Sequence, residues 1–437
     1  MELETLQCAD APEITSCDFL SGDFEGGSTT WPKVRLGDYV NLLAGFPFKS
    51  QQFTVNPNDI ALVKGENVSQ GCILWGISKR WPVSDWEKME KFHLLPGDVV
   101  IAMDRPWIPA GLKWSFIRVG DPKSLLVQRC ARLRSNNGRL DQNFLRFVIG
   151  SPSFENYVKP ITTGVNVPHI SGQQILDFEF TLPPLPVQRR IAGILSAYDD
   201  LIENCQRRIR ILESMARILY REWFVNFRFP GHENVPLVSS PLGAIPQGWE
   251  VVQLSSLVDF AKGRKPAETR PTQKLGDVKL LLIDSLHGGT PVFTSPAKLV
   301  LADIRDTIMV MDGASSCDVT IGSTGAVGST LGRFRTTRPD VFSAHALYRF
   351  LEAKAEEFKS KNIGAAIPHA NKDYILTQHI PLPPKTIASN FQVQLEPIQQ
   401  SIETLKSQIQ NLHQTRDLLL PRLLSGQMER NSIELSI

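Results

Sequence analysis

The stretch LPPLPVQRRIAGILSAYDDLIENCQRRIRILESMARIL at residues 182–219 has a counterpart, LPPKTIASNFQVQLEPIQQSIETLKSQIQNLHQTRDLL, at residues 382–419. The two stretches align without a gap at a constant offset of 200 positions. The match reaches back to Gly164 and Gly364 through a Pro-His pair that occurs in both copies. A repeat of this length predicts two copies of one structural unit.

Each copy contains two columns of apolar residues with heptad spacing, which is typical of a coiled coil. The double proline before each copy predicts a helix start, because proline suits the first turn of a helix and not its interior. One such helix alone would suit an amphipathic helix packed on its own globule, but its duplication favours pairing of the two. The columns hold Leu195, Ile202, Ile209, Leu212 and Leu219 in the first copy and Leu395, Ile398, Ile402, Leu405, Ile409, Leu412 and Leu419 in the second.

We therefore expect two helices of about 30 to 35 residues, paired antiparallel as a rod of roughly 45–50 Å. In the second helix, Pro397 predicts either a kink or the true start of the regular helix. Pro421 and Gly426 predict its end.

The segment before each helix also repeats its beginning, and GDVVIAMDR at residues 97–105 resembles RDTIMVMDG at residues 305–313. Short β-rich runs mixed with one amphipathic stretch indicate an α+β globule. The fold class is therefore α+β with a pseudo-two-fold internal repeat: a globule and a long helix, twice over. The aligned starts are Trp31, Val34, Leu36, Val40 and Gly45 against Trp249, Val252, Leu254, Val258 and Gly263.

Along the chain, these features predict six segments. They are an acidic flexible leader at residues 1–30, a globule at 31–182, a helix at 183–224, a linker at 225–248, a second globule at 249–382, and a second helix with the C-terminal tail at 383–437.

Composition narrows the class of protein. With 437 residues, 42% of them apolar, the chain has no apolar run near the ~18 residues that cross a bilayer, and no secretory signal, so we expect a cytoplasmic protein. Its six cysteines are scattered, which predicts free thiols and no metal site. The net charge of +2 includes seven acids and no Lys or Arg in residues 1–30, which leaves +9 for the rest. A basic body suits a polyanionic partner.

Three stretches carry a resemblance to a known family. They are residues 182–227, which begin LPPLPVQRR, IPQGWEVVQL at residues 245–254, and LLLPRLLSGQM at residues 418–428. Together with the duplicated order, they resemble the specificity subunit of Type I restriction-modification enzymes over nearly the whole chain from Trp31. The start of the second helix, LPPKTIASNF, departs from the Glu-Gln pattern of the family, of which the first helix keeps Gln188.

The resemblance implies that the two globules are target-recognition domains, each reading one half of a bipartite, asymmetric site in double-stranded DNA. It implies that the helices hold the half-sites apart and dock two methyltransferase subunits, which in turn support the restriction (translocase) subunits. No catalysis is implied for this chain; S-adenosylmethionine, ATP and Mg²⁺ are expected in the partner subunits.

Base edges and phosphates are read by Arg, Lys, Asn and Gln side chains, so exposed cations in the globules are the candidate DNA contacts. For each one, an ordinary surface charge is the competing interpretation. The basic loop at residues 262–265 is the strongest cluster, because its glycine permits close approach to a backbone. The candidates are Lys49, Lys64, Arg105, Arg129, Arg132 and Arg134 in the first globule and Lys262, Arg264, Lys265, Arg333, Arg335 and Arg338 in the second.

Two other function classes remain open from the residues. Asp340, Glu352 and Lys354 fit a loose spacing of metal-dependent nucleases, although the segment at residues 344–361 reads as a strand passing into a helix, which would separate the last two. The other is a coiled-coil scaffold that does not touch DNA. The duplicated Pro-His predicts a turn rather than a catalytic site, since no acid or nucleophile recurs beside it in sequence. The chain has no GxGxxG or GxxxxGK[ST] motif.

Overall fold

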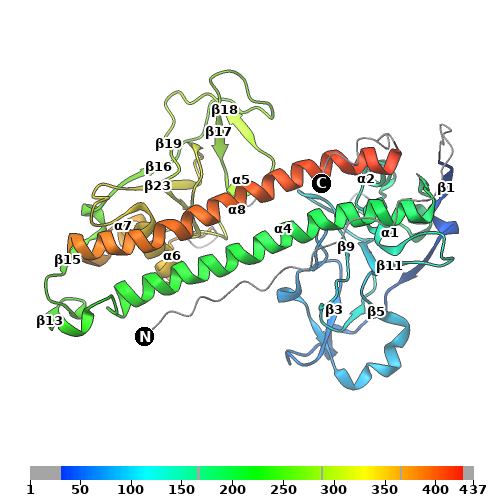
Figure 1. The fold of residues 1–437 in the computed structure, drawn as a ribbon, viewed down its shortest axis with the longest axis horizontal. Helices are drawn as coiled ribbons and strands as arrows, with labels where there is room; N and C mark the ends of the chain where they lie inside the picture. The colour runs from blue at the N-terminus through cyan, green and yellow to red at the C-terminus, as the bar shows by residue number, and fades with distance from the viewer. Residues whose placement is uncertain (1–30, 165–167, 287–288, 365–366, 427–437) are drawn as a thin grey trace, which may run out of the picture.

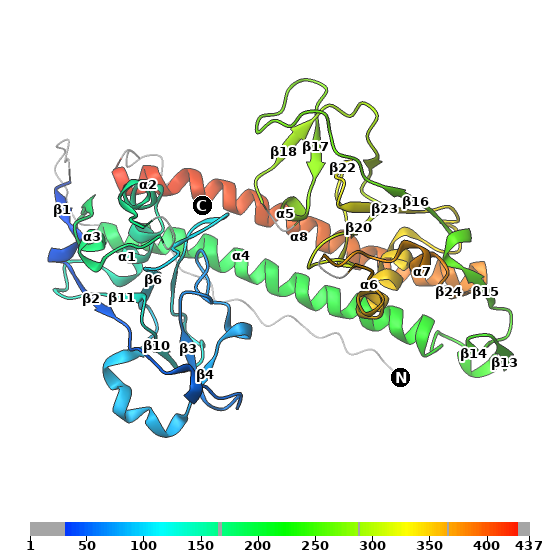
Figure 2. The ribbon, with the colours of Figure 1, turned by 180° about the vertical axis from the view of Figure 1, so that it is seen from behind.

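A computed structural model describes residues 31–164, 168–286, 289–364 and 367–426. Its two long helices, α4 (Leu185–Tyr220) and α8 (Lys385–Ser425), lie side by side along the longest axis of the molecule, with one globule toward each end (Figure 1). The opposite view in Figure 2 shows the same arrangement. The leader predicted at residues 1–30 and the last part of the predicted tail lie outside the described residues.

The two helices run antiparallel, as predicted. Contacts join Asp199 to Arg416 (2.8 Å), Cys205 to Gln408 (3.9 Å) and the ring of Phe224 to that of Phe391 (4.7 Å between centroids), so residue numbers rise on one helix as they fall on the other. With 36 and 41 residues, both helices are longer than predicted. Pro184 and Pro384 precede their first residues, which confirms the helix starts.

The repeat is visible in the burial of the rod. Residues 201–220 and 401–420 are buried, half-buried or exposed in the same order at every position except Ala216 and Arg416. The first turns of each helix contribute to the core of a globule, whereas the middle forms the seam between helices. Of the predicted column residues, Leu195, Ile202, Leu395, Ile402 and Leu405 are buried, and Ile209, Leu212, Leu219, Ile398, Ile409, Leu412 and Leu419 are half-buried.

Neither proline of the second helix interrupts it. Helix α8 begins twelve residues before Pro397, so Pro397 does not mark its start. Of the two residues predicted to end the helix, Pro421 lies inside it and Gly426 caps it. Pro397 leaves the carbonyl of Val393 without its helical partner, but Val393 is 69% exposed and water can hydrate that carbonyl. The helix ends at Gly426, whose φ of 72° is the left-handed conformation that glycine adopts readily.

In its described residues, the first globule has two four-stranded sheets and three short α-helices. In the first sheet the strand order is β2-β11-β6-β9, and in the second, β4-β3-β10-β5, the central pair β3-β10 is parallel. Their bounds are β2 Val40–Ala44, β11 Cys130–Ser135, β6 Val99–Ala102, β9 Trp114–Phe116, β4 Arg80–Trp81, β3 Ile60–Val63, β10 Ser124–Leu126 and β5 His93–Leu94. The remaining elements are β1 Lys33–Arg35 paired with β12 Glu179–Thr181, β7 Trp107–Ile108 paired with β8 Gly111–Leu112, and helices α1 Gln142–Ile149, α2 Pro152–Ile161 and α3 Gly172–Leu176.

The second globule repeats this frame. The order β16-β23-β20-β21 matches the first sheet, and the parallel pair β17-β22 matches β3-β10. At the end of β2 and of β16, Gly45 and Gly263 lie so close to the carbonyls of Val127 and Gly328 that a Cβ would fall 2.2 and 2.1 Å from their oxygens. The bounds are β16 Val258–Lys262, β23 Leu331–Thr336, β20 Thr307–Val310, β21 Val319–Ile321, β18 Val292–Thr294, β17 Val278–Leu281, β22 Gly325–Val327, β19 Leu301–Ala302, β15 Glu250–Gln253 paired with β24 His379–Leu382, α5 Ile283–Leu286, α6 Ala344–Ser360 and α7 Lys372–Leu376.

The expected passage from strand to helix after residue 343 is wrong, because all of residues 344–360 form helix α6. Ser343 caps it by accepting a hydrogen bond from the backbone N–H of Ala346 (3.2 Å). Its apolar residues cover both the sheet and α4, so tertiary packing on two sides explains a run that resembled a strand.

The chain reverses between the halves through a packed segment. Strands β13 (Leu237–Ser240) and β14 (Gly243–Pro246) form a hairpin at the end of the rod (Figure 1). The ring of Trp249 stacks on that of Phe229 (5.7 Å between centroids) and meets that of Phe224 edge-on (5.8 Å), and all three join the core of the second globule. This aromatic packing holds the reversal in place.

Within the described ranges, no helix combines the length and apolar character needed to span a bilayer. Cys72, Cys130, Cys205 and Cys317 are free thiols there, in agreement with the prediction.

Candidate nucleic-acid interface

Four of the predicted cations belong to the frame of the globules. Arg134 reaches the buried carboxylate of Asp98 (Nη2–Oδ2 2.8 Å), and Arg335 reaches Asp306 in the same way (Nε–Oδ1 2.7 Å). Each acid also accepts a backbone N–H three residues earlier in the chain. We call the pairs Arg134–Asp98 and Arg335–Asp306 the frame locks. They tie the central strands of each globule to the turn before β6 or β20.

Arg132 and Arg333 are the neighbours of these locks on β11 and β23. Arg132 is buried and donates to the carbonyl of His93 (3.1 Å). Arg333 pairs with Asp259 and donates to the carbonyl of Leu301 (3.1 Å). Both arginines donate their hydrogen bonds to acceptors within their own globule. The alternation of these arginines with apolar residues in the sequence therefore indicates a β-strand and not a surface of unpaired cations.

Three other predicted cations of the first globule gather at one end of its central strands, together with the histidine of the duplicated Pro-His and two residues that the sequence analysis did not single out, Asp104 and Lys113. Arg129 pairs with Asp104 (3.1 Å), and Lys64 pairs with Glu66 (3.1 Å). A Cβ on Gly65 would lie 4.0 Å from the Lys113 Nζ and 3.8 Å from the Asp104 carbonyl oxygen, which brings these loops together. We call this group strand-end cluster 1: Lys64, Asp104, Arg105, Lys113, Arg129 and His169.

Lys113 is only 9% exposed as a residue, and burial lowers the pKa of its ammonium, with repulsion from Arg105 acting in the same direction. A cation in this position gains from an added anion, because the anion offsets the cost of desolvating the charge. No sequence pattern distinguished Lys113, since one lysine beside a short strand is common.

The backbone at Arg105 is strained. Its φ of 44° lies in the left-handed region, and its N–H donates to the Pro168 carbonyl (2.7 Å). At the matching position of the second globule, Gly313 has a φ of 107° and donates to the Pro368 carbonyl (2.9 Å). Glycine adopts this conformation at little cost, whereas arginine does not. An exposed arginine held there against its own preference is a functional candidate.

A second group occupies the corresponding end of the second globule. Lys262 pairs with Asp312 (3.1 Å), and Arg264 donates to the Lys298 carbonyl (3.3 Å). With Lys265 next in the chain, this is the basic loop predicted from sequence. We call Lys262, Arg264, Lys265, Asp312 and His369 strand-end cluster 2.

The duplicated Pro-His is explained by these clusters. His169 Nδ1 pairs with the Asp104 carboxylate, and His369 Nδ1 pairs with that of Asp312 (2.8 Å). An acid therefore recurs beside each histidine in space, although none recurs beside it in sequence, and it comes from the Met-Asp dipeptide that both halves share. The intervening residues 165–167 and 365–366 lie outside the described part of the chain.

The remaining predicted cations lie in other loops. Lys49 is exposed after β2, and Arg338 is exposed between β23 and α6.

The three residues that fitted a nuclease spacing, Asp340, Glu352 and Lys354, each form an ion pair with a different residue outside the set. Asp340 pairs with Lys385 (3.3 Å), Glu352 with Arg349 (2.7 Å), and Lys354 with Glu357 (2.7 Å). Glu352 and Lys354 are two positions apart on helix α6, so their side chains point to different faces. This geometry does not form the joint carboxylate and lysine site that such a nuclease needs.

Comparisons with known proteins agree with this architecture. A model of the Type I restriction modification DNA specificity domain matches residues 28–213 and again residues 246–416. The EcoAI specificity subunit of Escherichia coli is 34% identical over 177 residues, which are 40% of this chain and 29% of that subunit. The HindI specificity subunit of Haemophilus influenzae is 21% identical, with 91% of this chain and 99% of the relative covered.

Among solved structures, the S subunit of a Type I restriction-modification system from M. genitalium superposes with a TM-score of 0.55 at 16% identity. It covers 92% of this chain and 98% of its own, which supports the two-globule fold. The two matched domains, the paired helices and the internal repeat lead to one assignment: the chain belongs to the family of Type I restriction-modification specificity subunits.

Proposed function

We propose that this chain is the non-catalytic specificity subunit of a cytoplasmic Type I restriction-modification complex. In this proposal each globule reads one half of a bipartite, asymmetric site in double-stranded DNA. Two methyltransferase subunits dock on the chain and support the restriction subunits. S-adenosylmethionine, ATP and Mg²⁺ act in those partners, and the methyltransferase flips the target adenine.

One observation carries the proposal: the two halves share their frame and differ at the strand ends. The frame locks recur in both globules, whereas cluster 1 has Arg105 and Arg129 where cluster 2 relies on Lys262, Arg264 and Lys265. Two globules with the same frame and different strand-end clusters suit the recognition of two different half-sites. Cations at the rims would bind phosphates and thereby set the register in which base edges are read.

The proposed site has a geometric consequence. Because α4 and α8 hold the globules near opposite ends of one rod, we expect half-site centres about one turn of DNA apart, with several unread base pairs between them. In this scheme the rod determines the spacing and the globules determine the sequences.

The test is single-molecule sequencing of adenine methylation in cells that contain the methyltransferase partner, with and without this chain. We expect a bipartite motif that appears only with the chain. If no motif depends on it while the purified complex binds DNA without sequence preference, the specificity role is refuted. Weak salt dependence of DNA binding would instead favour a scaffold without phosphate contacts.

A further inference from the structure

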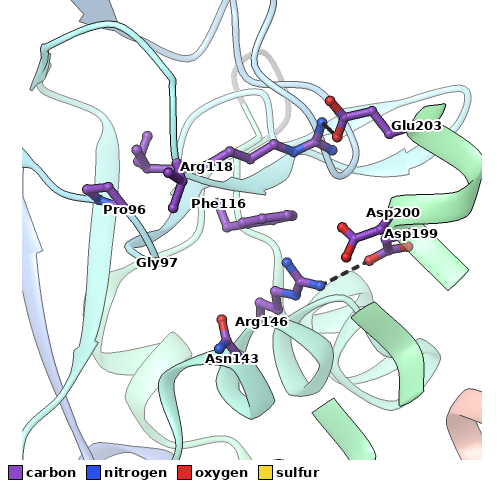
Figure 3. A pocket seen from close by; sticks show the side chains of 11 residues that line it. Pro96, Gly97, Phe116, Arg118, Asn143, Arg146, Asp199, Asp200 and Glu203 are labelled. Atoms are coloured by element: carbon purple, nitrogen blue, oxygen red, sulfur yellow. Dashed lines mark hydrogen bonds and ion pairs between the residues drawn. The ribbon is translucent and has the colours of Figure 1, made fainter. Parts of the chain in front are cut away.

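An arginine of the first globule reaches into the rod. Arg146 of α1 donates from Nη2 to the Ser196 hydroxyl (2.8 Å) and lies 3.4 Å from Asp199, both on α4. The opposite oxygen of Asp199 accepts from Arg416 of α8 (2.8 Å), so one carboxylate joins the globule to both helices. Figure 3 shows Arg146 pointing to Asp199 beneath the ring of Phe116, which lies 4.1 Å from the guanidinium.

A second ion pair supports this contact from the other side of the same cavity. Arg118 donates to Glu203 of α4 (2.8 Å), and a cavity of about 400 Å³ lies between the two ion pairs (Figure 3). We call the group Arg146, Asp199 and Arg416 clamp 1.

The second globule has its own arginine at the rod, and its contacts differ. The side chain of Arg349 in α6 is fully buried and donates to Glu213 of α4 (2.6 Å) and to Glu352 of its own helix (2.7 Å). Glu352 also pairs with Arg217 of α4 (3.2 Å). We call Arg349, Glu213, Glu352 and Arg217 clamp 2.

Both clamps use α4, although the helix that follows the second globule is α8. Asp199 and Glu213 are fourteen residues apart on one helix, which is about 21 Å along its axis. The apolar contacts of the globules with the rod are non-directional and tolerate small rotations. A buried guanidinium held by acceptors on two elements is directional and loses its hydrogen bonds on rotation.

We propose that clamps 1 and 2 fix the rotational setting of the globules on the rod and so select a single spacer length between half-sites. This inference rests on the proposed function. Adding one base pair to a spacer moves a half-site by about 3.4 Å and turns it by about 35° around the DNA axis. A globule locked in rotation cannot follow that turn, whereas a globule freed from its clamp can. Arg349 is therefore a positioning residue for site selection and touches no DNA.

The test compares Arg349→Met with Arg270→Met in the complete complex. Arg270 is a matched control, since it pairs with Asp277 (2.9 Å) and Glu268 inside the second globule. We expect wild type and Arg270→Met to methylate sites of one spacer length. For Arg349→Met we expect the same two half-sites, with methylation at spacers one base pair longer or shorter raised about tenfold, equivalent to about 1.4 kcal/mol.

Circular dichroism of the purified chain verifies folding. If Arg349→Met is unfolded, Glu213→Gln replaces it, because that variant removes the charge and keeps the side-chain volume. A folded variant with an unchanged spacer profile overturns the inference, as does a change in the half-site bases. If the wild-type chain directs methylation to no bipartite motif at all, the proposed function fails. If a bipartite motif is found but its spacer length is the same with and without the clamp, only the present inference fails.

Discussion

The frame locks and the strand-end clusters show opposite behaviour between the two halves. Arg134–Asp98 and Arg335–Asp306 occupy matching strands with matching geometry. At the strand ends, Arg105 replaces Gly313, and the cation beside the shared Asp-His pair is Arg129 in one half and Lys262 in the other, supplied by different loops. The comparison indicates that the ion pairs with buried carboxylates stabilise the fold of each globule, while the residues of the strand-end clusters can differ without changing that fold.

The largest expected effect comes from breaking a frame lock. Arg134→Met and Arg335→Met leave Asp98 and Asp306 buried at 3% and 1% exposure without their partner cation. We expect each to reduce the free energy of unfolding of its globule by about 3 kcal/mol, because an uncompensated buried charge is costly. Urea unfolding followed by tryptophan fluorescence measures this loss.

The control for that experiment is Arg338→Met, which removes an exposed cation and should change stability by less than about 0.5 kcal/mol. Unequal losses for Arg134→Met and Arg335→Met would contradict the equivalence of the two frames.

An intermediate effect is expected at the strained position of cluster 1. Arg105→Gly gives this position the residue found at Gly313, which removes a cation and relieves the backbone. We expect no loss of thermal stability, but weaker DNA binding with the slope of log K against log salt reduced by about 0.9, the value for one phosphate contact. Fluorescence anisotropy of labelled DNA at several salt concentrations tests this.

Gly313→Arg is the reciprocal variant, and we expect it to destabilise the second globule because it introduces the strain. If Arg105→Gly left DNA affinity and its salt slope unchanged, Arg105 would be a surface charge without a role in binding.

The smallest expected effect is a difference between the two globules in how their stability depends on pH. Burial lowers the pKa of His345 in the second globule from 6.5, and its Nδ1 has no hydrogen-bond partner among the residues that the structure describes. The position two residues after the helix cap is Asn143 in the first globule. The folded state binds this proton less tightly than the unfolded chain does, so stability is complete above pH 6.5 and is lost as the pH falls below it.

We expect the second globule to lose stability between pH 7.5 and 5.5, and His345→Gln to lessen that loss, in thermal melts at the two pH values. His379→Gln, which changes an exposed histidine, serves as control. An equal pH dependence of wild type and His345→Gln would exclude this histidine as the source.

Much of the architecture was predictable because it depends on periodicity. The constant offset between Gly164 and Gly364 and the heptad columns predicted a repeat with paired helices, since a long apolar stripe must be buried along its whole length. The first part of helix α6 was predicted as a strand because its apolar residues cover two neighbours, which erased the one-sided pattern of an amphipathic helix. The start predicted at Pro397 was wrong for a related reason. The energetic cost of a proline inside a helix depends on whether water reaches the carbonyl that loses its hydrogen bond, here that of Val393, and the sequence does not show this.

The candidate interface was predictable only in part. Lys64, Arg105 and Arg129 were identified as basic residues, but their convergence with Lys113 and His169 joins loops that are far apart in the chain. Arg134 and Arg335 looked equally available in sequence, but each is paired with a buried carboxylate.

The sequence by itself determined the duplication, the two helices and the family to which the chain belongs, because these are encoded in local spacing and order. The tertiary structure alone decided which arginines are free, which lock a frame and which clamp a globule to the rod. A cation's role depends on the carboxylates and water around it, and residues distant in sequence supply those surroundings.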